Sequence, residues 1–66
     1  MRVNVNGEER QLPQGMDVSA LIAVHQLTPD KVAVELNRRL LRRERYDTVL
    51  KEGDWVEIVT FVGGGD

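Results

Sequence analysis

The sequence predicts an α+β domain in which a mixed β-sheet packs on one main helix. The chain has 66 residues and no cysteine, so it can form one small domain without disulfides. Hydrophobic residues follow the two-residue period of strands near both ends of the chain, and one segment between them follows the period of a helix. A hairpin, a crossover helix and further strands together give a sheet that the helix covers on one face.

The N-terminal segment predicts a β-hairpin. Val3 and Val5 alternate with polar residues, so both are expected on one face of the first strand. Asn6-Gly7 follows directly and is typical of a tight hairpin turn, because both residue types tolerate positive φ. The return strand is expected over residues 9–12, which are mostly polar and therefore lie where one face meets water.

One amphipathic helix is expected to begin after Asp17, whose carboxylate can accept hydrogen bonds from free backbone N–H groups. It should span about ten residues and end before Thr28-Pro29, since the residue before a proline is biased away from the α region. The apolar positions of its buried face are Val18, Leu21, Ile22 and, at the boundary, His25.

The second half of the chain predicts three further strands. Turns are expected at residues 37–39 and 51–54, and residues 44–50 are expected to be irregular, with Tyr46, Val49 and Leu50 available for packing. The strands are expected over residues 32–36, 40–41 and 55–62. This order of elements is the β-grasp arrangement, with residues 1–62 as the domain and residues 63–66 as a flexible, glycine-rich tail.

The last strand has two apolar faces, and alternation alone leaves open which one is buried. If Val56 and Ile58 belong to the core, Val59 and Phe61 form an exposed patch beside the tail. Clustered exposed apolar groups of this kind indicate a partner surface. In the alternative, Trp55, Val59 and Phe61 are themselves the core face.

Several segments resemble the ThiS family of sulfur carriers. They are Glu52-Gly53-Asp54, the alternating residues 56–59, the ending 61–65, and the stretches 34–37 and 45–46. The resemblance covers essentially the whole chain, and the glycine ending after this strand is its most specific part. It implies the ubiquitin-like β-grasp fold.

The resemblance also implies a function, in which the protein is a carrier and not an enzyme. A ThiF-type adenylating enzyme would use ATP to activate the C-terminal carboxylate, a cysteine desulfurase relay would supply sulfur, and a ThiG-type thiazole synthase would consume it for thiamin. Gly64 and Gly65 match the family's diglycine, and the Gly65 carboxylate would become the thiocarboxylate. Val59, Phe61, Val62 and Gly63 are the candidate partner contacts. The carrier itself needs no cofactor and no metal.

Asp66 departs from the family pattern, because it places the Gly65 carbonyl in a peptide bond. Three explanations are open. A peptidase trims Asp66 from a precursor, the residue was added for expression of the protein, or the domain is not a carrier. Two other functions stay open: a MoaD-like sulfur carrier for molybdopterin synthesis, and a non-covalent interaction module with the same fold.

Composition argues against other classes of function. The net charge of −2 does not favour nucleic-acid binding. No apolar run spans a membrane and the N-terminus does not resemble a signal peptide, so a cytoplasmic location is expected. His25, the one histidine, has no partners at metal-ligand or catalytic spacing. The arginines of residues 38–45 fit either contact with an acidic partner or ATP phosphates, or a solvated, protected sheet edge. Glu44, Asp47 and Glu52 lie close to them in the sequence and could neutralise part of their charge.

Overall fold

The structure, a computed structural model, describes residues 1–61. The expected domain boundary after residue 62 and the tail 63–66 therefore lie outside the described residues. Two single-turn 3₁₀ helices, Pro29–Lys31 and Arg43–Arg45, accompany the regular elements. The strands and the helix are β1 (Arg2–Val5), β2 (Glu8–Gln11), α1 (Val18–Val24), β3 (Val32–Leu36), β4 (Arg39–Leu41) and β5 (Trp55–Thr60).

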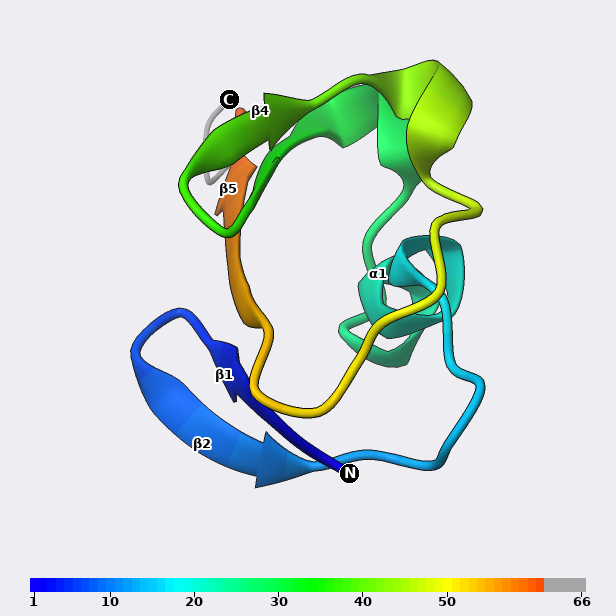
Figure 1. Cartoon of the computed structure of the whole chain (residues 1–66). Coiled ribbons are helices and arrows are strands. Elements are labelled where there is room, and N and C mark those ends of the chain that lie inside the picture. Colours follow the sequence, from blue (N-terminus) through cyan, green and yellow to red (C-terminus); the bar gives the residue numbers. More distant parts are fainter. Residues whose placement is uncertain (62–66) are drawn as a thin grey trace.

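The five strands form one mixed sheet in the order β2-β1-β5-β3-β4. β1 and β5 are parallel, whereas β1–β2, β3–β4 and β3–β5 are antiparallel. The sheet curves around α1, which lies against one of its faces (Figure 1). This is the β-grasp fold, as the order of elements predicted. β5 is the central strand, so its two faces decide both the core and the surface.

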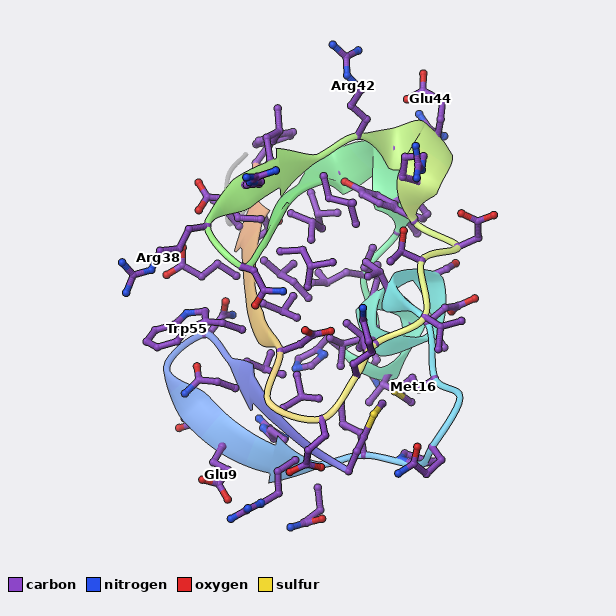
Figure 2. All side chains as sticks on the ribbon, in the orientation of Figure 1. Glu9, Met16, Arg38, Arg42, Glu44 and Trp55 are labelled. Atoms are coloured by element: carbon purple, nitrogen blue, oxygen red, sulfur yellow. The ribbon has the colours of Figure 1, made fainter. Side chains whose placement is uncertain are left out.

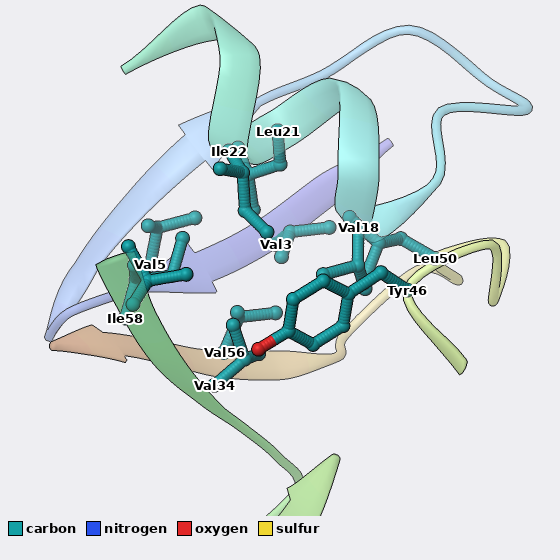
Figure 3. Packing of buried hydrophobic residues seen from close by; sticks show 11 residues of the cluster. Val3, Val5, Val18, Leu21, Ile22, Val34, Tyr46, Leu50, Val56 and Ile58 are labelled. Carbon is teal, nitrogen blue, oxygen red and sulfur yellow. The ribbon is translucent and has the colours of Figure 1, made fainter. Parts of the chain in front are cut away.

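The core fills the space between the sheet and α1. Val3, Val5 and the helix residues Leu21 and Ile22 are almost fully buried, as the sequence patterns predicted. Tyr46 closes one side of the cluster, with its ring among aliphatic side chains (Figure 3). The remaining members are Val18, Val32, Val34, Leu50, Val56 and Ile58. Val49 was expected to be available for packing beside Leu50, but its side chain is 51% exposed.

The helix begins as predicted and ends earlier than predicted. The Asp17 side chain accepts a hydrogen bond from the Ala20 N–H at 2.8 Å, which caps the first turn. The helix ends at Val24 because Gln26 takes a left-handed conformation, with φ 61°. The N–H groups of Gln26 and Leu27 then bond to the carbonyls of Ala23 and Ile22, which is a Schellman motif.

Two tight turns set the register of the sheet. Asn6 and Gly7 both have positive φ, as the predicted hairpin turn requires. Asn37 and Arg38 form a second turn of this kind, with φ 53° and 70°, so Arg39 belongs to β4 and not to the expected turn 37–39. The Asn37 amide donates to buried Asp54 at 3.0 Å, which ties this turn to the start of β5.

No helix within residues 1–61 is long and apolar enough to span a membrane.

Candidate functional site

β5 separates the core from the exposed apolar patch. Val56 and Ile58 are 0% and 8% exposed and face α1, whereas Val59 and Phe61 are 59% and 66% exposed. This decides between the two interpretations of the strand, because successive side chains point to opposite faces. The predicted exposure of Val59 and Phe61 is confirmed. Their role in binding a partner stays a prediction.

The neighbouring strands extend this exposed surface. Ala33 of β3 lies directly across from Val59, and Leu40 of β4 lies across from Glu35 on the same face. Leu40 is 71% exposed. The sequence analysis missed it as a surface residue, although two adjacent leucines on a strand must point to opposite faces. We call the exposed apolar residues of this side, Leu40, Trp55, Val59 and Phe61, the outer face.

Charged groups lie among these apolar residues. Glu35 and Glu57 are exposed and directly opposite each other across β3 and β5, an arrangement of like charges that disfavours pairing. At the start of β5 the Arg38 guanidinium lies over the Trp55 ring, 5.5 Å from its centroid. Figure 2 shows this pair on the side of the molecule that faces away from α1. The surface on this side of the sheet is therefore apolar near the end of β5, whereas charged groups lie among the apolar residues near the start of β5.

The backbone stays attached to the fold as far as Phe61. Its N–H donates a hydrogen bond to the Lys31 carbonyl at 3.0 Å, one residue before β3 begins. β5 therefore ends beside Val59 and Phe61, at the edge of the outer face. The other predicted site residues, Val62, Gly63, Gly64 and Gly65, lie outside the described residues.

The rest of the described chain offers little catalytic chemistry. His25 is half-buried, with Nδ1 3.0 Å from the Leu21 carbonyl oxygen of its own helix. Across residues 1–61, no three His, Cys, Asp or Glu side chains gather as a metal site would require.

A surface depression of about 310 Å³ lies at the other end of β5, against β1. There the Glu52 carboxylate accepts a 2.8 Å hydrogen bond from the Arg2 backbone N–H and a further one from its guanidinium. These contacts, the backbone one first, lower the pKa of Glu52. Because the ion pair joins the N-terminal strand to the turn before β5, it serves the fold.

Comparison with known proteins identifies the family. The model of the ThiS family matches residues 3–65, which is nearly the whole chain. The chain belongs to the ThiS family. The match runs through the glycines that follow β5, so it includes the segment on which the sequence resemblance rested most.

Individual relatives agree with this assignment. The sulfur carrier protein ThiS of Bacillus subtilis (strain 168) is 45% identical over 49 residues, which cover 73% of this chain and 74% of that protein. The crystal structure of a thiamine biosynthesis protein (ThiS) from Geobacter metallireducens superimposes with a TM-score of 0.79 at 35% identity. That match covers 98% of this chain and 100% of the other.

A second group of relatives is much longer than this chain. The thiazole synthases of Magnetococcus marinus and Paramagnetospirillum magneticum are 38% and 41% identical to it over 66 residues, or 98% of this chain. The chain spans only about a fifth of the length of each of these proteins. A ThiS-like segment therefore occurs within proteins named thiazole synthase.

Proposed function

We propose that this ThiS-family chain is a sulfur carrier for thiamin biosynthesis, with sulfur held as a thiocarboxylate at the carbonyl of Gly65. The observation that carries the proposal is the family match through residue 65, which includes the glycines that follow β5 in the sequence, together with the exposed apolar residues near the end of that strand. Gly64 and Gly65 have no Cβ atom, so such a terminus can enter a narrow enzyme site. Asp66 must be absent before the Gly65 carboxylate can react.

The chemistry requires activation by a partner enzyme. A carboxylate is a poor acyl electrophile, so it first attacks the α-phosphate of ATP, and pyrophosphate leaves. The terminal sulfur of a persulfide on a cysteine desulfurase relay then attacks the acyl adenylate carbonyl, and AMP leaves. A second thiol reduces the resulting acyl disulfide, which frees the thiocarboxylate and leaves the two thiols joined as a disulfide. The chain's own contribution is to present its terminus in the geometry that a ThiF-type enzyme needs. The ATP belongs to that enzyme, and a ThiG-type thiazole synthase then takes the sulfur.

The outer face is the proposed docking surface for both enzymes. Leu40 and Val59 project from neighbouring parts of the sheet, and Phe61 stands where the chain leaves it. Clustered exposed apolar groups of this kind mark protein interaction sites. Docking there would place the tail close to the active site of the enzyme.

Intact mass spectrometry tests the carrier function. We would incubate the full chain, and a form ending at Gly65, with ATP, a ThiF-type enzyme and a sulfur donor. The shorter form is expected to gain the mass of one sulfur-for-oxygen exchange, whereas the full chain gains it only after losing Asp66. No change in the shorter form, with enzymes that load another ThiS protein, would contradict the proposal.

A matched pair of substitutions tests the docking surface. Val59→Glu places a charge on the outer face, and Val24→Glu places one on the exposed side of α1, where the side chain is 61% exposed. We expect Val59→Glu to lower kcat/KM for adenylation about tenfold, which corresponds to about 1.4 kcal/mol. Val24→Glu should leave it unchanged. Equal effects of the two variants would argue against the outer face.

A further inference from the structure

Five exposed arginines lie at one edge of the sheet. We call Arg38, Arg39, Arg42, Arg43 and Arg45 the basic edge. They fall within eight consecutive residues that hold a single acidic residue, Glu44, although the whole chain has a net charge of −2. The charge of the protein is therefore strongly uneven, with its positive part concentrated around β4.

The basic edge is not neutralised by the protein itself. Within residues 1–61, every ion pair closer than 4 Å involves Arg2 or Arg10, on the opposite side of the sheet. Of the carboxylates near the arginines in sequence, Glu44 and Asp47 are exposed and form none of these pairs. Glu52 pairs with Arg2 instead. None of the three carboxylates that were expected to neutralise part of the cluster therefore forms an ion pair with it.

Asp30 is an acidic group that the basic edge does influence. Its pKa is lowered mainly by a hydrogen bond from the Thr28 side chain, and Lys31 and Arg43 add smaller electrostatic contributions. Asp30 is fully exposed, so solvent screens this attraction. The guanidinium groups thus stay available to an outside partner.

The position of the basic edge brings it close to the outer face. Val34 pairs with both Leu41 and Ile58, so Arg42 and Arg43 follow β4 at the same end of the sheet where β5 ends. In Figure 2, Arg42 projects outward from the end of β4. A partner that covers the outer face and receives the tail would therefore reach the arginines as well.

Protection of the edge strand does not account for all five arginines. One or two charges on a short edge strand suffice to prevent edge-to-edge pairing, and Arg39 already lies on β4. Arg38 lies in the preceding turn, Arg42 directly follows the strand, and Arg43 and Arg45 belong to a 3₁₀ turn. This spread suits an extended surface of carboxylates better than one phosphate group, since guanidinium groups pair with carboxylates through two parallel hydrogen bonds.

We propose that the basic edge docks onto an acidic face of the partner thiazole synthase, next to the outer face. The inference rests on the proposed function, and it selects this partner because ThiS-like segments occur within proteins named thiazole synthase. Complementary charge of this kind mainly speeds association and makes it sensitive to salt. The outer face then supplies the apolar contacts.

The test compares two charge reversals of equal size. Arg42→Glu/Arg43→Glu alters the basic edge, and Arg10→Glu/Lys51→Glu makes the same change in net charge at exposed sites away from it. Association of each chain with the thiazole synthase from the same genome is measured by stopped flow at low and high salt. We expect the first variant to associate at least about tenfold more slowly at low salt. The control should stay within about twofold of the unaltered chain.

Several outcomes would overturn this inference. One is equal slowing of both variants, which means that net charge alone matters. Another is unchanged association of Arg42→Glu/Arg43→Glu together with slower ATP-dependent adenylation, which assigns the arginines to the activating enzyme. Circular dichroism checks that each variant folds. If Arg42→Glu/Arg43→Glu unfolds, Arg42→Gln/Arg43→Gln replaces it. That variant should also associate more slowly than the unaltered chain, but by a smaller factor.

Sulfur loading of each variant, followed by mass spectrometry, separates the two proposals. If the unaltered chain gains sulfur but associates with the synthase at a rate independent of salt, the docking role of the basic edge is wrong and the carrier function stands. If it neither gains sulfur nor binds the synthase, both fail.

Discussion

Replacement of valine by threonine at two positions of β5 measures which face of the strand is buried. Val56 is fully buried and Val59 is 59% exposed, and both changes keep the size and the β-branch of the side chain. At Val56 the new hydroxyl enters an apolar core, which costs about 1–3 kcal/mol of unfolding free energy. At Val59 the hydroxyl meets water, and a surface change of this kind stays within about 0.5 kcal/mol.

Thermal and urea unfolding give the measurement, with Trp55 fluorescence and far-UV circular dichroism as two probes. A domain of this size loses about 4–8 °C of Tm per kcal/mol, so Val56→Thr should melt roughly 4–24 °C lower. That loss is a large share of a total stability of about 3–10 kcal/mol. Val59→Thr should melt close to the unaltered protein. A larger loss for Val59→Thr than for Val56→Thr would refute the assignment of faces.

Substitutions at three further positions probe local features of the fold. Gln26→Gly should raise the free energy of unfolding in urea by about 0.5–1 kcal/mol, because glycine adopts the left-handed conformation of this helix end without steric cost; an unchanged urea midpoint would contradict this. Arg38→Gly should be about 1 kcal/mol more stable than Arg38→Ala in the same assay, since both lose the contact with Trp55 and only alanine keeps the strained positive φ; equal stability would exclude strain at this turn. Because the pKa of Glu52 is lowered below its ordinary value of 4.5, its charge stabilises the fold above that pH, and the benefit is lost as the pH falls through the folded value. Melting curves from pH 7 to pH 3 should therefore show Glu52→Gln less stable than the unaltered protein at neutral pH, with the difference shrinking as the pH falls below 4.5; a difference as large at pH 3 as at pH 7 would contradict this.

Regular elements could be predicted from the sequence because their patterns are local. Val3 and Val5 alternate with polar residues, Asp17 caps the helix, and Asn6-Gly7 makes the hairpin turn, so each is recognisable within a few residues. The end of α1 could not be placed, because the left-handed residue is Gln26 and not the glycine that usually marks such a position. The two 3₁₀ turns are too short to leave a periodic pattern.

The candidate site was predictable only in part. The burial of Val56 follows from packing against α1 across the sheet, which no local pattern of β5 reveals; the structure was needed to choose between its faces. Leu40 joins the outer face through the register of β4, and register depends on the turn at Asn37 and Arg38. Glu52 does not pair with the basic edge because it is held by Arg2, which lies far from it in the sequence.

Delivery of sulfur from the loaded chain to thiazole synthase is the decisive measurement of the carrier function. The form ending at Gly65 would be loaded as its thiocarboxylate, purified, and mixed in a single turnover with thiazole synthase and the synthase's other substrates. Mass spectrometry would follow the protein while chromatography follows the thiazole. A sulfur carrier should lose its thiocarboxylate in step with thiazole formation, one for one. Loss of sulfur without thiazole, or a thiocarboxylate that the synthase leaves intact, would contradict it.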